Sequence, residues 1–366
     1  MNQMVNNYTV RPPLARCKGK QKGVFVRFLM SIFPVKGDEI VEIIRKVVFI
    51  GAVTAFVITG GSLLWEIFGQ VRQIYVVEGK IEQEKINGSL NLSEEERNKI
   101  SSENPYIRED MMGLYAQNSD LVGWINIGGE DKIINNAVVQ AADNDKYLTT
   151  DFYGGYSSSG TIFADYRGNF TTGGRAPNFL VLYGHNTFSS MAFSKITRYY
   201  YDKDNLGEGS DLTMSFYYKY PTIYFDTLAE EGEYKVFAVC LFNTEEQYGE
   251  VYNYLRRCRA FESKEDFNNY ILDIMDRSVL LTDVDLQYGD DILCLSTCYF
   301  IFGSGYENTR CVVFARKVRD GESPEVDTSV ATRNYYWKGW QQAIDRGLCS
   351  SGQRVWDYRK YLLSYE

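Results

Sequence analysis

The sequence predicts a mostly β protein: a closed or nearly closed antiparallel barrel, with helices before it and one helix inserted near its end. Three observations support this fold class. From residue 123 onward, short aromatic and β-branched runs alternate with glycine-rich turns, and the 366 residues include 29 Tyr and 21 Phe. An uncharged stretch and a polar, helix-forming segment precede that region. A single helical pattern interrupts the strand-like runs.

The uncharged stretch, Val47 to Trp65, is 19 residues long. As a helix it would span roughly 28 Å, close to the hydrocarbon thickness of a bilayer. A buried core helix would show a polar stripe, and a cleaved signal peptide would have a shorter apolar region. We therefore expect a membrane anchor at residues 47–68. Residues 1–46 carry a net charge of +6 within a chain of net charge −9. This basic flank predicts a cytoplasmic segment at 1–46 and places residues 70–366 outside the cell.

Residues 69–105 are polar and charged. Within them, Ser93 followed by Glu96 is a capping-box pattern, which is typical of a helix start. Asn104-Pro105 then indicates a boundary. We interpret 69–105 as an extracellular helical stalk or linker, followed by a helix from Ile107 to Gln117.

Residues 106–319 form the predicted barrel domain. Its strand-like runs are "GWINI", "INNAVVQ", "TIFADY", "NFLVLYG", "TIYFDT", "YKVFAVCLF", "DILCLSTC" and "RCVVFARKV". The inserted helix follows Ser263, a good N-cap residue. Its apolar positions are Phe267, Tyr270, Ile271 and Ile274, at the i, i+3, i+4, i+7 spacing of a buried helical stripe.

Composition excludes some functions. The acidic net charge gives no basis for non-specific binding to nucleic acid. His185 is the only histidine, so a two-histidine metal site within this chain is excluded. Cys294 and Cys298 would lie roughly 13 Å apart on one strand, too far for a disulfide. The irregular spacing of the seven cysteines does not indicate a disulfide framework. Pairing stays open among four of them: Cys240, Cys258, Cys311 and Cys349.

Cys298 ends the apolar run "LCLSTC", where a cysteine is a candidate nucleophile. Attack on an amide needs a thiolate, a proton donor for the leaving amine and a stabiliser for the oxyanion. His185 follows the strand "FLVLY", and Arg310 opens the strand after Cys298. If the last two strands pair antiparallel, Cys298 and Arg310 lie at the same edge of the barrel. The alternatives are a structural histidine and a surface arginine, which are common for residues of these types taken singly.

The wider sequence resembles the class B sortases, cysteine transpeptidases of the Gram-positive cell surface. The resemblance rests on "YGHN", on "LSTC" and on an Arg twelve residues after the Cys. Further segments occur in family order across about 195 residues, among them "GWINI", "VVQAADNDKYL", "GTIFADYRGN" and "RCVVFARKV". The helix inserted before the catalytic strand is also a class B feature. The resemblance implies a closed antiparallel sortase-type β-barrel.

In function, the resemblance implies cleavage of a C-terminal sorting signal after its Thr and a thioester on Cys298. Transfer would follow to an amine of a cell-wall precursor or a pilin lysine. His185 would act as general acid and then base, and Arg310 would stabilise the oxyanion. The positions that match the family's substrate groove are Asn144, Leu148, Tyr183, Ser296 and Thr297. No metal or other cofactor is implied. The loop of the inserted helix is expected to form one wall beside Cys298.

The sequence departs from the family pattern at three places. Cys294 replaces a Thr, Tyr299 stands where an acidic or polar residue often follows the nucleophile, and "NNAVVQ" replaces the usual "YPVVQ". Residues 320–366 extend past the last expected strand. Their near-helical apolar positions, Tyr336, Trp340, Ile344 and Leu348, favour packing on the barrel, with substrate gating or partner docking as the alternative.

Two other functions share features with this sequence. L,D-transpeptidases also use Cys, His and Arg at the cell wall, but their "SHGC" run is absent from this sequence. The second rival is a non-catalytic, membrane-tethered β-domain that binds wall or surface proteins. Reactivity of Cys298 toward a thiol reagent, compared with a His185→Ala variant, distinguishes an enzyme from a binder.

Overall fold

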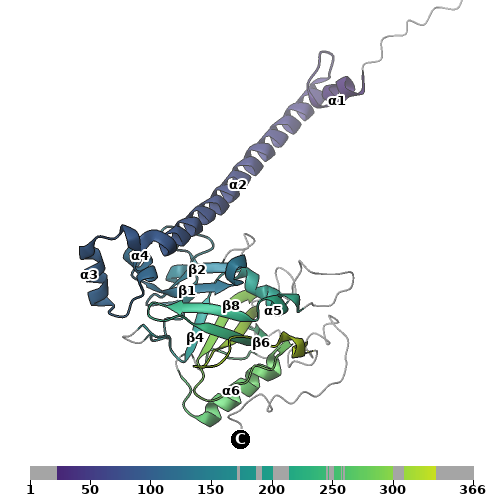
Figure 1. Cartoon of the computed structure of the whole chain (residues 1–366). Coiled ribbons are helices and arrows are strands. Elements are labelled where there is room, and N and C mark those ends of the chain that lie inside the picture. Colours follow the sequence, from purple (N-terminus) through teal and green to yellow (C-terminus); the bar gives the residue numbers. More distant parts are fainter. Residues whose placement is uncertain are drawn as a thin grey trace, which may run out of the picture. The chain divides into compact units, whose positions relative to one another are not determined.

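The computed structural model describes residues 23–170, 174–186, 192–200, 214–244, 246, 251–256, 258, 260–299 and 309–334 (Figure 1). The chain divides into two compact units, Met1–Gly69 and Gln70–Glu366. The expected helical pattern around Tyr336, Trp340, Ile344 and Leu348 lies outside the described residues.

The first unit holds helix α1 (Val24–Ile32) and the beginning of helix α2 (Ile40–Asn87). Among the described residues, α2 is the one helix long and apolar enough to cross a membrane, with a mean hydropathy of 2.2 in its apolar window. That window is not buried by other parts of the protein. The uncharged stretch from Val47 to Trp65 is therefore a continuous, exposed apolar helix, as a membrane anchor requires.

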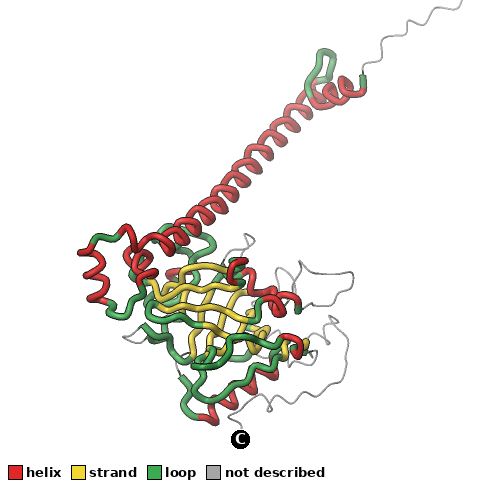
Figure 2. The backbone as a smooth tube through the Cα atoms, viewed as in Figure 1, coloured by secondary structure: helices red, strands yellow, loops and turns green. Residues whose placement is uncertain are grey.

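The second unit is built around a closed eight-stranded barrel in the order β1-β2-β3-β4-β8-β9-β6-β5 (Figure 2). Each strand coincides with one of the apolar runs of the sequence. The strands are β1 (Leu121–Ile127), β2 (Ile134–Val139), β3 (Phe163–Ala164), β4 (Phe179–Tyr183), β5 (Thr222–Thr227), β6 (Glu233–Asn243), β8 (Ile292–Tyr299) and β9 (Thr309–Lys317). A separate two-stranded sheet pairs β7 (Leu280–Leu281) with β10 (Thr332–Arg333).

Two parts of the predicted fold class were wrong. The barrel is mixed, not antiparallel, because β2 pairs with β3 and β4 pairs with β8 in parallel. An apolar run has the same pattern in either direction, so strand direction was not encoded in the feature used to find the strands. The protein is also not mostly β, since 42% of it is helical. Much of that content is α2, whose 48 residues extend well beyond the uncharged stretch.

Helices between the apolar stretch and the barrel pack on the barrel. After α2 come η1 (Gly88–Asn91), α3 (Glu94–Glu103) and α4 (Glu109–Gln117). The predicted capping box is confirmed, with Ser93 and Glu96 each bonding the other's backbone N–H. Ile81 of α2 is buried in a cluster with Trp124 and Phe152. Residues 70–103 thus have the expected helical character but belong to the same compact unit as the barrel.

Short helical turns complete the second unit: η2 (Gly129–Asp131), η3 (Lys146–Leu148), η4 (Ser194–Tyr199), α5 (Ser215–Lys219) and η7 (Thr328–Val330). The predicted inserted helix is α6 (Lys264–Arg277), capped by Ser263, whose side chain accepts from the Asp266 N–H. All four predicted apolar positions of α6 are buried.

Strands β8 and β9 have two buried faces. Leu293 and Leu295 of β8 point into the barrel interior, together with Val313 of β9. The opposite face is covered by α6, in a cluster that includes Cys294 and Phe314. Helix α6 lies along the outside of the sheet (Figure 1). Residues of even number on both strands therefore face outward. In the middle of the strands they face α6, and beyond the helix they face other segments.

Candidate active site

Strand β8 carries Cys298 to the point where α6 no longer covers the sheet. Residues 292 to 297 are buried, whereas Cys298 and Tyr299 are half-buried. Cys294 lies on the same face four residues earlier, and full burial raises the pKa of its thiol well above the usual value. Cys240, Cys294, Cys298 and Cys311 are free thiols.

Strand β9 places Arg310 directly beside Cys298. The two strands are antiparallel, and Cys298 is paired with Arg310 in their register. The expectation from the sequence is confirmed in this respect. The Arg310 guanidinium donates one hydrogen bond, from Nη1 to the Thr309 carbonyl at 3.2 Å. No carboxylate among the described residues forms an ion pair with it.

The third candidate, His185, follows β4. Because β4 runs parallel to β8, with Tyr183 opposite Ser296, the ends of both strands lie at the same edge of the barrel. The Nε2 atom of His185 lies 2.8 Å from the Leu148 carbonyl oxygen. A carbonyl only accepts hydrogen bonds, so Nε2 carries a proton here and Nδ1 is the other available ring nitrogen.

Three hydrogen bonds join the residues on either side of His185 to β8. The Gly184 N–H donates to the Ser296 carbonyl at 3.3 Å. The Thr297 hydroxyl donates to the Gly184 carbonyl at 2.7 Å. The Asn186 side-chain amide donates to the carbonyl of Cys298 itself at 2.9 Å. His185 is thus held between two residues that are both tied to the strand of the nucleophile.

All eight residues singled out from the sequence line one open groove with a volume of about 480 Å³. They are Cys298, His185, Arg310, Asn144, Leu148, Tyr183, Ser296 and Thr297. The remaining wall comes from Phe163, Gly184, Asn243, Thr244 and the segment 251–255. A groove of this size accommodates a short extended peptide segment rather than a whole folded domain.

No protein-family model matches the chain. Curated relatives do. Sortase B of Staphylococcus aureus (strain NCTC 8325 / PS 47) is 27% identical over 219 residues, which cover 60% of this chain and 78% of that protein. Sortase B of Listeria monocytogenes serovar 1/2a (strain ATCC BAA-679 / EGD-e) is 29% identical over 215 residues, covering 59% and 76%.

The chain is a homologue of sortase B. By this homology it is a cysteine transpeptidase of the sortase B type. Solved structures agree on the fold. The Staphylococcus aureus sortase B–substrate complex is similar with a TM-score of 0.50 and 24% identity, covering 68% of this chain and 97% of that one. Sortase B from B. anthracis in complex with AAEK1 has a TM-score of 0.50 and 25% identity, covering 69% and 99%.

One buried carboxylate organises a side of the groove in this sortase B homologue. Asp165 Oδ2 accepts hydrogen bonds from the Tyr183 hydroxyl at 2.8 Å and from the Asn144 amide at 3.2 Å. Arg167 donates to both of its oxygens at 2.8 Å. Burial raises the pKa of Asp165, but the hydrogen bonds from Arg167 and Tyr183 outweigh it and lower the pKa to about 2.

The groove wall that was expected from the loop of the inserted helix is confirmed only in part. Residues 251–255, in the connection before α6, line the groove, but α6 itself does not. Helix α6 instead supports this wall through hydrogen bonds. Its Tyr270 hydroxyl donates to the Tyr254 carbonyl at 2.6 Å, and Tyr254 in turn bonds the Ser296 hydroxyl at 2.8 Å. The sequence missed this wall because "VYNYL" has no pattern beyond ordinary aromatic composition.

Tyr299, a departure from the family pattern, does not line the groove. Its ring packs against Tyr200, with centroids 5.4 Å apart. Asn186 is the functional candidate that sequence reasoning missed. The available signal was its position next to the only histidine, in "YGHN".

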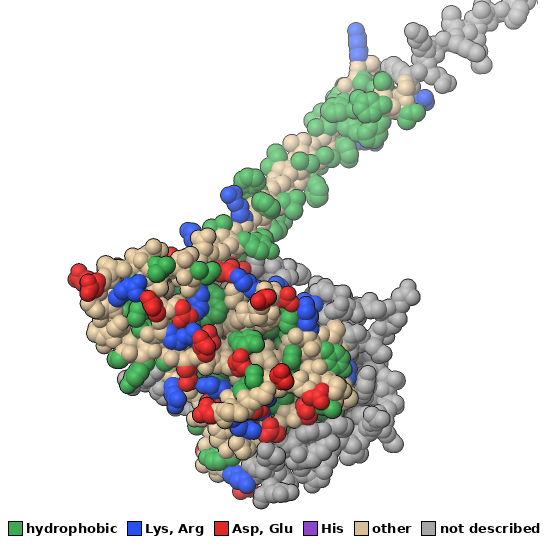
Figure 3. All heavy atoms as spheres, in the orientation of Figure 1, with side chains coloured by type: hydrophobic (Ala, Val, Ile, Leu, Met, Phe, Trp, Pro, Cys, Tyr) green, Lys and Arg blue, Asp and Glu red, His purple; other side chains and the backbone are tan. Residues whose placement is uncertain are grey.

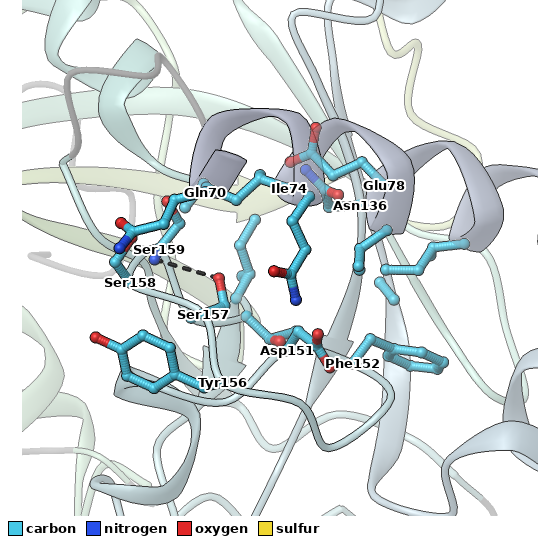
Figure 4. A pocket seen from close by; sticks show the side chains of 18 residues that line it. Gln70, Ile74, Glu78, Asn136, Asp151, Phe152, Tyr156, Ser157, Ser158 and Ser159 are labelled. Atoms are coloured by element: carbon cyan, nitrogen blue, oxygen red, sulfur yellow. Dashed lines mark hydrogen bonds between the residues drawn. The ribbon is translucent and has the colours of Figure 1, made fainter. Parts of the chain in front are cut away.

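A second pocket of the same unit lies between α2 and the loop after η3 (Figure 4). Gln70, Ile74 and Glu78 enter it from the helix, and Ser157 to Ser159 from the loop. Burial raises the pKa of Glu78, against a hydrogen bond with Asn136. Its volume is about 60 Å³, room for no more than a few waters, and it contains none of the eight groove residues. No group of three or more metal-ligating side chains is found among the described residues.

Proposed function

We propose that this sortase B homologue cleaves a C-terminal sorting signal after its Thr and transfers the protein ahead of the cut to an amine. The acceptor would be a cell-wall precursor or a pilin lysine. One observation carries the proposal: Cys298 of β8, Arg310 of β9 and His185, which follows β4, line the same groove.

In the first half-reaction, the Cys298 thiolate attacks the Thr carbonyl carbon and forms a C–S bond. The carbonyl π electrons move onto oxygen, which becomes an oxyanion beside Arg310. When the oxyanion collapses, the C–N bond breaks and the leaving amine takes a proton from His185. The product is a thioester between the Thr carbonyl and Cys298, with His185 left neutral.

In the second half-reaction, the acceptor amine attacks the thioester carbon, and neutral His185 takes up the amine proton. Collapse of the second oxyanion breaks the C–S bond. This regenerates the thiolate and protonated histidine, and a new amide bond joins the substrate protein to the acceptor. The bond between Nε2 and the Leu148 carbonyl leaves Nδ1 as the nitrogen suited to this proton transfer.

Arg310 is suited to the oxyanion role because no carboxylate among the described residues neutralises it. Its guanidinium is an always-charged, planar donor. A positive charge beside Cys298 also favours the thiolate. Asn144, Leu148, Tyr183, Ser296 and Thr297 would bind the signal, since they line the groove on both sides of the nucleophile. The network around Asp165 supports two of them, Asn144 and Tyr183.

The same proposal covers the topology. Residues 47–68 would anchor the chain, with residues 1–46 in the cytoplasm and the barrel of residues 106–319 outside the cell. The exposed apolar helix and the basic flank support this orientation. Protease added to intact protoplasts should digest the barrel; complete protection of residues 106–319 would show that the orientation is reversed. Residues 320–366 would pack on the barrel, with substrate gating or partner docking as the alternative.

The activity is tested with the full chain in detergent and a library of sorting-signal peptides. Mass spectrometry should detect an acyl adduct on Cys298 that hydroxylamine removes, and added amines should yield ligated products. The sequences of the ligated products give the signal, and the preferred amine gives the acceptor class. His185→Ala should slow acylation while leaving the protein folded.

Cys294→Ala is the matched control, because Cys294 lies on the same strand face but is fully buried. This variant should still form the adduct. Peptide binding without any adduct, in a correctly folded chain, would instead support a non-catalytic binding domain. An adduct that persists in Cys298→Ala would assign the nucleophile elsewhere.

A further inference from the structure

Helix α1 presents an apolar surface that no described residue of the first unit covers. None of its nine residues is buried. Val24 is 81% exposed, Phe25 71% and Phe28 59%. The space-filling view shows hydrophobic side chains gathered around α1 and the start of α2 (Figure 3). In water this much exposed aromatic and aliphatic surface is unfavourable, so α1 requires a covering partner.

The chain folds back after α1 and returns to α2. Pro34 prevents the helix from continuing, and Phe33 before it is extended. Gly37, with φ of +109°, allows the reversal that leads into α2. The Lys46 ammonium then donates to the Met30 carbonyl at 2.7 Å, near the end of α1. The C-terminal end of α1 is therefore fixed beside the second turn of α2.

The charges at this reversal are compensated within the unit. Lys46 is only 5% exposed and pairs with Asp38 at 2.8 Å and with Glu42 at 3.8 Å. Glu42 also pairs with Arg45 at 2.6 Å. Ion pairs of this kind lower the cost of moving charged side chains out of bulk water and into a region of lower dielectric constant.

We propose that α1 lies flat in the interface of the same bilayer that α2 enters, on the anionic side, with its phenylalanines among the acyl chains. The inference rests on the anchor proposed above. Nine residues rise about 14 Å as a helix, too short to cross a bilayer but suited to lying in its plane.

The apolar surface of α1 is expected to contact lipid because α1 is directly connected to the anchor. The uncharged stretch of α2 begins at Val47, immediately after the lysine that holds α1. Wherever that stretch enters the bilayer, α1 is held at the same boundary. The surrounding charge fits an anionic surface. Residues 1–46 have a net charge of +6, and Arg27 lies in α1 itself, away from the phenylalanines.

The test places a tryptophan on either side of α1 in the full chain. Phe25→Trp replaces an aromatic residue of the apolar face, and Ser31→Trp, about 120° around the helix from it, is the matched variant on the narrow polar face. Each is reconstituted in vesicles of phosphatidylcholine with phosphatidylglycerol, with and without brominated acyl chains. Emission of the parent chain is subtracted, because it has five tryptophans of its own. The added emission of Phe25→Trp should be lost in brominated vesicles and resist aqueous acrylamide. Ser31→Trp should show the reverse.

Three results would overturn the proposal. Equal acrylamide quenching of both variants would place α1 in water. Shielding of Phe25→Trp without bromine quenching, increasing with protein density, would assign the surface to a second copy of the chain. The emission of Trp65, obtained by subtracting the Trp65→Phe spectrum from that of the parent chain, shows whether the anchor lies in the bilayer. If Trp65 is not quenched by brominated lipid, the anchor and the α1 proposal both fail, whereas transpeptidation measured in detergent stands independently.

Discussion

Strand β9 carries two arginines on the same outward face, one near each end, and they differ in almost every respect. Arg310 is half-buried beside Cys298 and has one hydrogen bond, to a carbonyl. Arg316, about 20 Å away along the strand, has no exposed surface. It donates to the Asp285 carbonyl at 3.0 Å and pairs with the carboxylates of Asp285 and Glu322.

Two cysteines on the neighbouring strand β8 differ in the same way as the two arginines. Cys294 lies beneath α6, where burial holds its thiol neutral, and Cys298 lies in the groove just beyond it. Within one pair of strands, the buried end carries a charge compensated by Asp285 and Glu322, and an inert sulfur beneath α6. The open end carries an accessible thiol and a charge that no carboxylate of the described residues pairs with. Residue type alone therefore does not decide which Arg or Cys is reactive; the cover over the sheet does.

The largest expected effect is at the two cysteines. Cys298→Ala should abolish turnover, because no other thiol among the described residues lines the groove to hold the acyl group. Cys294→Ala should keep its activity and lose about 1 kcal/mol of unfolding free energy at most, for a small buried group. Peptide release and denaturant unfolding measure the two outcomes. Release of the leaving peptide by Cys298→Ala would refute covalent catalysis.

Arg316→Met should come next, as a loss of stability without a specific loss of chemistry. Asp285 keeps its ion pair with Arg319, and Glu322 keeps its ion pair with Lys235. The loss of the buried guanidinium should therefore cost about 3 kcal/mol, the lower end of the range for breaking a buried pair. Denaturant unfolding of the folded variant should show this shift, with KM unchanged. An unfolding free energy equal to that of the parent would mean that the ion pairs contribute nothing net.

Arg310→Met should give the opposite profile. Loss of an oxyanion donor is expected to lower kcat by about 10²–10³, or about 2.7–4 kcal/mol of transition-state stabilisation. Stability should change by only about 0.5 kcal/mol, since the side chain has no ion pair with any of the described residues. Single-turnover acylation kinetics measure the rate. If Arg310→Met is destabilised but fully active, Arg310 has a structural role like that of Arg316 and does not stabilise the oxyanion.

Asp165, beside the groove, should also make the free energy of unfolding depend on pH. The folded pKa of Asp165 is lowered from 3.8 to about 2. Its contribution, about 2 kcal/mol, is therefore complete above about pH 5 and is lost as the pH falls through 4 toward 2. Unfolding measured at pH 6 and at pH 3 should differ by less in Asp165→Asn than in the parent. An identical pH slope in both would assign the loss to other carboxylates.

The smallest effect is expected at Asn186. Asn186→Ala removes one hydrogen bond to the Cys298 carbonyl, worth about 1 kcal/mol, so kcat should fall by several-fold with KM little changed. Asn178→Ala is the matched control, because Asn178 precedes β4 and bonds Asp291 at 2.6 Å, far from the groove. Equal losses of activity in both would mean that the bond at Asn186 has no special role.

Much of this arrangement could be predicted from local sequence pattern. Each of the eight barrel strands coincides with an apolar run, and Ser93 and Ser263 cap the expected helices. The register that pairs Cys298 with Arg310 follows from a loop joining adjacent strands. These features depend on neighbours in sequence, and so they can be found in one chain.

What the sequence did not reveal depends on contacts between distant segments. The parallel direction of β4 and β8 is fixed by the long connection between them, which no local pattern encodes. The groove wall at 251–255 is held by Tyr270 and by Ser296. Asp165 reads as an ordinary turn residue in "FADYRG" until Tyr183 and Asn144 are seen to converge on it.

The parallel pairing of β4 with β8 also bears on when activity arises during synthesis. Gly184 and Thr297, which join the two strands, are 113 residues apart. Strands β8 and β9 fill the gap between β4 and β6, and they are the last two strands of the barrel to leave the ribosome. Until they arrive, β4 and β6 present open edges, and His185 has neither Cys298 nor Arg310 beside it. We expect the catalytic residues to assemble in the step that closes the sheet, so that a partly made chain carries no reactive thiol site.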